Sequence, residues 1–187
     1  REDAMPQWEQ LIADIRRVQT EIHWLMPDRG LLPAPPAGAS PGALRAAEAR
    51  IGARLPPMYR AFLAQHDGWP GFFEGVTLLG TAHLGRRLYE DLARSVFERA
   101  ETPVPLREGP PSRSVRGPRA LLPIAVDIAT TTVFAFDLDT RDARGECEVV
   151  CWINDLGVRC ADFADCLRTE LELCAAELDE TIARAVA

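Results

Sequence analysis

Three histidines are the side chains in this sequence best suited to move protons: His23, His66 and His83. His66 precedes Asp67, which suggests a base with its orienting acid, but adjacent side chains rarely face each other in that way. His66 is better explained as a ring that interacts with the dipole at the end of a predicted helix. The sequence has no lysine, GxSxG elbow, HExxH motif or Gly-rich phosphate loop. We therefore predict a protein that is not an enzyme and uses no cofactor.

Carboxylates gather around a predicted turn at residues 139–142. Two of them could meet across strands as a glycosidase-like pair, but acids are common at turns, where they are solvated and bond to nearby N–H groups. We expect them to be exposed on turns and strand ends and to contact a basic protein. This candidate binding set is Asp137, Asp139, Asp142, Glu146, Glu148 and Asp155, with Asp127 as a lesser candidate.

The net charge of −7 is concentrated in the last third of the chain. Residues 127–187 contain 14 acids and 5 arginines, whereas the acids and arginines before them nearly balance. Nucleic-acid binding needs a positive field that faces phosphates, so we predict no nucleic-acid partner. An acidic face suits a basic protein partner, and the alternative is that these charges serve only solubility.

Five cysteines occur without a CxxC pair and with no histidine near them in sequence: Cys147, Cys151, Cys160, Cys166 and Cys174. This pattern predicts no metal site and favours reduced, buried cysteines in a cytosolic setting. No apolar run approaches the roughly 18 residues that span a bilayer, and the start REDAMPQWEQ lacks a signal pattern. We expect a cytoplasmic protein with no membrane partner. The sequence does not begin with Met, which leaves open a targeting segment ahead of residue 1.

Apolar periodicity predicts the elements that position these residues. Apolar residues at three- and four-residue steps indicate helices over 3–26, 41–52, 55–67, 82–99 and 162–186. Short β-branched or aromatic segments indicate strands over 75–80, 121–127, 132–138, 146–154 and 157–163. Residues 27–42 form a linker rich in Pro and Gly, and residues 101–119 form a basic loop that we expect to be mobile. The order predicts an α+β fold with N-terminal helices, an antiparallel meander and a closing C-terminal helix.

The segment ALRAAEARIGARLPPMYRAFLAQHDGWPG (43–71) resembles the signature of the SUKH superfamily, a helix followed by LPPxYRxFL and a glycine. Segments 135–138 and 149–155, and the step from Asp162 to Phe163 into the last helix, are similar to the second half of that family. Asp67, the Trp69-Pro70 pair and the long 81–119 segment depart from its pattern. The motif residues have structural roles: Leu55, Pro56, Pro57, Tyr59, Arg60, Phe62, Leu63, Gly68 and, downstream, Trp152.

The resemblance implies binding, because bacterial members of this superfamily are typically immunity proteins that block toxins encoded beside them. A cognate basic toxin domain is the expected partner, with a nuclease or deaminase favoured by the acidic last third. The alternative is a regulatory scaffold without a toxin partner, as a yeast relative that regulates cell-wall synthesis indicates. Residues 1–39 are predicted to add a helix and linker to a SUKH-like region over 40–187, within a single domain.

Overall fold

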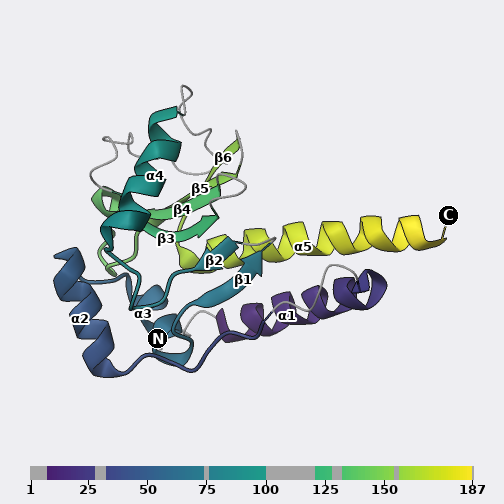
Figure 1. The fold of residues 1–187 in the computed structure, drawn as a ribbon, viewed down its shortest axis with the longest axis horizontal. Coiled ribbons are helices and arrows are strands. Elements are labelled where there is room, and N and C mark those ends of the chain that lie inside the picture. The colour runs from purple at the N-terminus through teal and green to yellow at the C-terminus, as the bar shows by residue number, and fades with distance from the viewer. Residues whose placement is uncertain are drawn as a thin grey trace. The chain divides into compact units, whose positions relative to one another are not determined.

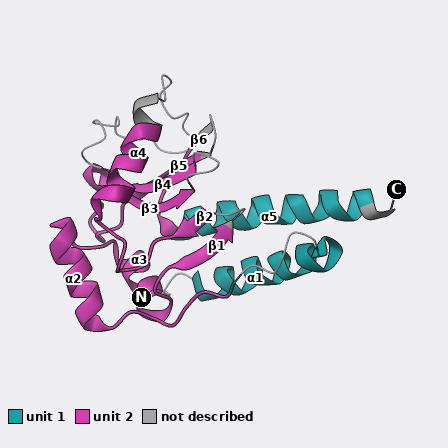
Figure 2. Cartoon of the chain, in the orientation of Figure 1, with its two compact units in different colours: residues 1–33, 164–187 teal, residues 34–163 magenta. Residues whose placement is uncertain are grey.

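A computed structural model describes residues 8–27, 33–73, 76–99, 121–127, 132–153 and 156–186. The chain divides into two compact units, which Figure 2 colours separately: unit 1 is residues 1–33 and 164–187, and unit 2 is residues 34–163. This division groups the two ends of the chain, whereas the sequence predicted a boundary after residue 39. That the whole chain folds as one domain stays a prediction.

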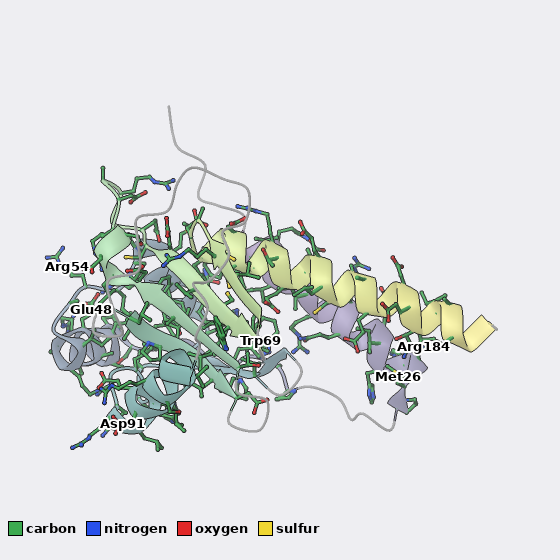
Figure 3. All side chains as sticks on the ribbon, turned by 90° about the horizontal axis from the view of Figure 1, so that it is seen from above. Met26, Glu48, Arg54, Trp69, Asp91 and Arg184 are labelled. Atoms are coloured by element: carbon green, nitrogen blue, oxygen red, sulfur yellow. The ribbon has the colours of Figure 1, made fainter. Side chains whose placement is uncertain are left out.

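Unit 1 consists mainly of two helices, α1 (Trp8–Leu25) and α5, which spans Phe163–Val186. The two helices run alongside each other in Figures 1 and 3. The buried face of α1 follows a three- and four-residue spacing through Trp8, Ile12, Ile15, Val18 and Ile22. The sequence predicted both helices to within a residue or two, apart from residues 3–7, which lie outside the described residues.

Unit 2 is built on a six-stranded antiparallel sheet in which every strand pairs with the next one in sequence. Figure 1 shows this meander, and its strands are β1 (Trp69–Phe73), β2 (Val76–Leu78), β3 (Leu121–Asp127), β4 (Thr132–Asp137), β5 (Glu148–Ile153) and β6 (Leu156–Cys160). Every residue of β4 is buried, so both faces of the sheet are covered at its centre. The register places Asp137 opposite Glu148, and Val150 opposite Arg159. The predicted α+β class and meander are confirmed.

The motif helix α3 (Pro57–Gln65) anchors its aromatic side chains in this unit. Tyr59, Phe62 and Leu63 are fully buried, and the Tyr59 ring lies edge-on to Phe136 of β4 and to Phe163, with centroids 5.4 and 5.0 Å apart. The Tyr59 hydroxyl donates a hydrogen bond to the carbonyl of Leu79 at 2.7 Å. The predicted burial of these three residues and of Trp152 is therefore confirmed.

Helix α2 (Pro41–Ile51) begins and ends as the sequence predicted. The Ser40 hydroxyl accepts the N–H of Ala43, Pro41 follows it, and Gly52 ends the helix at a φ of 73°. Helix α3 instead ends at His66, whose N–H donates to the Phe62 carbonyl at 2.7 Å. The predicted end at Asp67-Gly68 was therefore slightly late.

The middle of unit 2 differs most from the prediction. Residues 81–85 form turns, so helix α4 (Arg87–Arg99) begins later than predicted, and it contacts β3 and β4. Strand β1 was missed because the second and third residues of its sequence, WPGFF, are the Pro and Gly that usually mark a turn. The loop expected to be mobile, at 101–119, lies outside the described residues. Within the described residues, none of the helices combines the length and apolar character needed to cross a membrane.

Candidate partner-binding surface

Five of the six predicted binding carboxylates lie between the end of β4 and the start of β5. We call residues 137–148 the acidic loop. It begins at Asp137, continues through the short 3-10 helix Leu138–Thr140 and a turn, and ends where β5 begins at Glu148. The sixth carboxylate, Asp155, lies outside the described residues. The lesser candidate, Asp127, is half-buried at the end of β3.

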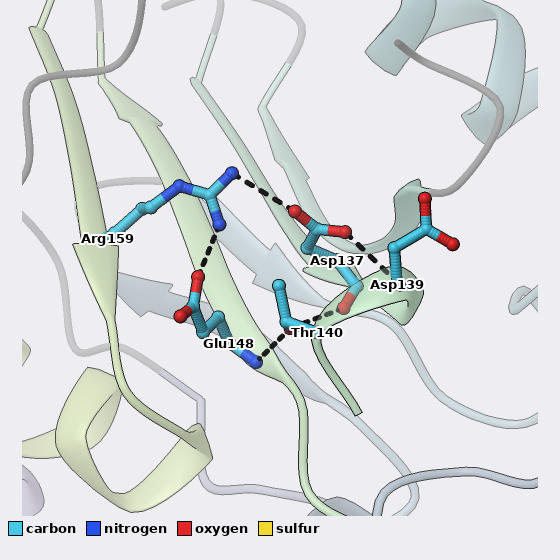
Figure 4. A network of polar contacts seen from close by, with 5 residues as sticks. All are labelled: Asp137, Asp139, Thr140, Glu148 and Arg159. Carbon is cyan, nitrogen blue, oxygen red and sulfur yellow. Dashed lines mark hydrogen bonds and ion pairs between the residues drawn. The ribbon is translucent and has the colours of Figure 1, made fainter. Parts of the chain in front are cut away.

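Asp137 is buried rather than exposed, which corrects the prediction for this residue. Its side chain is 3% exposed and pairs with Arg159 of β6, with Nη2 3.1 Å from Oδ2 (Figure 4). The other terminal nitrogen of Arg159 lies 2.6 Å from Glu148 Oε2, so one guanidinium bridges two carboxylates. Because strand side chains alternate between faces, these three residues share one face of neighbouring strands. Their charges are paired with one another inside the sheet and are largely withdrawn from a partner.

Asp137 also shapes the first turn of the acidic loop. Its carboxylate accepts the N–H of Asp139 at 3.2 Å, and its carbonyl accepts the Thr140 hydroxyl at 2.7 Å. Thr140 Oγ1 in turn accepts the N–H of Glu148 at 2.9 Å (Figure 4). This chain of bonds closes the turn and leaves the Asp139 side chain exposed, as predicted.

Asp142 organises the second turn of the acidic loop. Oδ1 accepts the N–H groups of Arg144 and Glu146 at 2.8 and 2.9 Å, and Oδ2 pairs with the Arg144 guanidinium at 2.9 Å. Partial burial acts to raise the pKa of Asp142, but the hydrogen bonds from Arg144 and from the two backbone N–H groups hold it below its usual value. Asp142 is exposed, as predicted, and it has local partners as well.

Glu146 is the second correction, because its side chain turns into the protein and the residue is 5% exposed. Its Oε1 accepts the N–H of Met58 in the first turn of α3, at 2.9 Å and across 88 residues of sequence. A carboxylate at this end of a helix interacts favourably with the helix dipole. Burial nevertheless raises the pKa of Glu146; the Met58 N–H lowers it, and the negative charges of Asp162 and Asp142 raise it further.

Arginines complete the attachment of the acidic loop to the segment that leads into α3. Arg141 donates to the carbonyl of Gly145 and to that of Arg54, each at 2.7 Å. Together with the Met58–Glu146 bond, these contacts fix the turn of the acidic loop against residues 54–58. The segment that leads into α3 therefore supports the loop that carries the candidate acids.

The structure thus places five of the six predicted acids in the acidic loop but exposes only some of them. Asp139 and Asp142 are exposed, Glu148 is half-buried, and Asp137 and Glu146 are buried. Sequence reasoning missed Arg141, Arg144 and Arg159 as their partners. One signal was available, since an arginine inside a short strand of apolar residues often has a buried carboxylate partner.

The five cysteines are buried, as predicted, and none forms a disulfide. Burial raises the pKa of the Cys147 thiol to about 11, opposed by the positive charge of Arg141, so this thiol stays protonated at neutral pH. Tyr59, whose pKa is also raised by burial and then by Asp67, stays neutral as well. These groups suit a packed interior rather than proton-transfer chemistry.

Residues 38–169 match the model of a protein family, the SMI1 / KNR4 family (SUKH-1). The matched span includes α2, α3, the sheet and the acidic loop. No curated protein matches the chain.

Proposed function

The chain belongs to the SMI1/KNR4 (SUKH-1) family, and on that basis we propose that it is an immunity protein that binds and neutralises a cognate toxin domain. Membership supports an immunity or regulatory role in general. The family match over residues 38–169 is the observation that carries the proposal. We further propose that the protein acts by occluding the active site of the toxin, without chemistry of its own, in the cytoplasm.

The charges of the chain support a basic partner. The last 61 residues, 127–187, carry 14 acids and 5 arginines, and an acidic protein surface accelerates encounter with a basic one. Toxins that act on nucleic acid carry basic substrate grooves, which favours a nuclease or deaminase as the target. Within the acidic loop, Asp139 and Asp142 are the exposed acids that we propose as contacts.

The attachment of the acidic loop also supports a binding role. Hydrogen bonds from Arg141 and Met58 hold the loop before any partner arrives. A surface that is already ordered loses little conformational entropy on binding, so more of the contact energy appears as affinity.

Co-expression with the toxin encoded by a neighbouring gene tests this proposal. Cells that express the C-terminal toxin domain should grow only when this protein is present, and the two proteins should co-purify as a stable complex. Absence of both rescue and complex formation with each neighbouring candidate would contradict the immunity role. A complex with a non-toxic partner would favour the regulatory alternative.

A further inference from the structure

Two buried cysteines of unit 2 lie close together on neighbouring strands. Cys151 belongs to β5 and Cys160 to β6, and their sulfur atoms are within 4.8 Å of each other. The strand register explains this approach, because Cys151 is opposite Val158 and Cys160 is opposite Val149. Since strand side chains alternate between faces, the two cysteines lie on the same face of the sheet, one diagonal step apart.

This geometry suits a shared metal ion better than a disulfide. Diagonal neighbours on antiparallel strands are about 7–8 Å apart, whereas the Cα atoms of a disulfide are usually about 4.4–6.8 Å apart. A direct bond between Cys151 and Cys160 would therefore require the backbone to move. A thiolate lies about 2.3 Å from a zinc ion, so two thiolates on one ion of that size can be up to about 4.6 Å apart. The observed separation of the two sulfur atoms is compatible with such a bridge.

The surroundings of the two sulfur atoms favour a soft ion that needs few ligands. Val149 and Val158, which share the face with the cysteines, offer no oxygen or nitrogen ligand, so the hard ions Mg²⁺ and Ca²⁺ are disfavoured. Thiolates select Cu(I) and Zn(II) among the common ions. Structural zinc sites use four ligands, whereas Cu(I) forms stable complexes with as few as two thiolates. The two strands therefore supply a ligand set that suits Cu(I).

We propose that Cys151 and Cys160 form a binding site for a Cu(I) ion. Each thiol releases its proton as the sulfur binds, so two protons leave when one ion enters, and the ion stays monovalent throughout. The bound ion links β5 to β6. The sequence predicted no metal site because the cysteines lack CxxC spacing, whereas this pair is created by the pairing of two strands. The inference does not depend on the immunity role.

Strand β6 provides a route for the ion to the buried sulfur atoms. Cys151 and Cys160 are 3% and 1% exposed, so the closed sheet does not admit an ion from solvent. In the described part of the chain, β6 is the last strand of the sheet and pairs with β5 alone. Local opening of such an edge separates β6 from β5 and exposes both cysteines together. We therefore expect slow uptake by the folded protein and a folded state that the ion stabilises.

Competition for Cu(I) tests the site. The reduced protein is titrated without oxygen into Cu(I) held by bicinchoninate, a coloured chelator. Wild type should take one equivalent of the ion, and Cys151→Ala and Cys160→Ala should each bind it at least about tenfold more weakly. Cys147→Ala is the matched control, because Cys147 is an equally buried cysteine of unit 2 outside this pair. Alanine keeps each position apolar, and circular dichroism checks that the variants are folded.

Two further measurements are made on the copper-loaded protein. X-ray absorption of loaded wild type should show sulfur as the nearest neighbour of copper, a result that needs no variant. Copper should raise the unfolding temperature of wild type and Cys147→Ala but not that of Cys151→Ala. Equal affinities of Cys151→Ala and Cys147→Ala would overturn the proposal, as would oxygen or nitrogen neighbours at the copper. No toxin is present, so a failure here leaves the immunity role standing, and a failed rescue assay leaves the copper site standing.

Discussion

Arg159 of the edge strand β6 and Asp137 at the end of β4 form an ion pair across 22 residues of sequence, with both side chains about 95% buried. Strand β5 lies between them and contributes Glu148 as the second carboxylate. A shift of β6 by one residue would turn Arg159 to the opposite face, so this pair selects one register for an edge strand.

Arg159→Met should therefore destabilise the protein severely. Asp137 would remain buried without its cation, and breaking a buried pair in this way costs about 3–5 kcal/mol. Urea unfolding of the variant and wild type measures the difference. Arg168→Met is the control, since Arg168 pairs with Asp165 at an exposed position and its loss should cost less than about 1 kcal/mol. Similar losses for the two variants would contradict a special role for Arg159.

Most of the fold could be predicted from the sequence because local patterns determine it. Ser40-Pro41 and Gly52 set the bounds of α2, and alternation and turn residues located β3 to β6. Strand β1 could not be predicted in this way, because Pro70 and Gly71 are typical of turns. The strand forms through its pairing with β2, which local sequence preference does not show.

The location of the acids could be predicted, but their exposure could not. Asp137 and Glu146 occur beside turn residues, where acids usually face water. Their partners, Arg159 and Met58, are distant in sequence, and no local pattern shows that they approach. Asp139 and Asp142 are exposed, as acids near turns usually are, because their hydrogen bonds lie within the acidic loop itself.

Gly38→Ala should destabilise unit 2. The segment around Gly38 runs against the end of α3, where the Ala39 N–H donates to the Leu63 carbonyl at 2.8 Å. A Cβ at position 38 would lie 2.0 Å from the carbonyl oxygen of Ala64, so the backbone must move at a cost of about 1–3 kcal/mol. Thermal unfolding measures the change.

Gly42→Ala provides the matched control for that substitution. Gly42 lies in the first turn of α2, and its added Cβ would meet only the Ser40 hydroxyl at 3.7 Å. This variant should be as stable as wild type or slightly more so, because alanine favours the helix. Equal effects of the two substitutions would show that the close approach at Gly38 does not matter.

The titration of Glu146 should contribute to the pH dependence of the unfolding free energy. Burial raises the pKa of Glu146 in the folded state, so between its usual and its raised pKa the folded state binds more protons than the unfolded state. Its contribution to the unfolding free energy is therefore favourable at low pH and is lost as the pH rises through the folded pKa. Asp142, whose pKa is lowered, contributes in the opposite direction at more acidic pH.

Glu146→Gln should remove the first of these contributions. Gln keeps an oxygen that can accept the Met58 N–H but cannot ionise, so the stability of the variant relative to wild type should increase from pH 4 to pH 7. Urea unfolding across that range measures the difference, and Asp139→Asn is a control for loss of an exposed acid. Parallel curves for Glu146→Gln and wild type would contradict a raised pKa at Glu146.

The last prediction concerns how the acidic loop meets a partner. Asp139 is exposed, and its own backbone N–H, rather than its carboxylate, maintains the turn, so its charge can be reversed with little effect on the fold. Asp139→Arg should lower the association rate constant with the cognate toxin domain about threefold at low salt and change the dissociation rate constant less. The reason is that exposed charges steer encounter more than they hold the complex.

Asp179→Arg is the control, since Asp179 is an exposed acid of α5 outside the acidic loop, and its reversal changes the net charge equally. Stopped-flow measurements of the association rate across a salt series compare the two variants. If the loop faces the partner, Asp139→Arg should be slower than Asp179→Arg at low salt, and the difference should shrink as the Debye length falls below about 10 Å above 0.1 M salt. Equal rates for both variants at every salt concentration would mean that net charge steers the partner and that the acidic loop is not the contact surface.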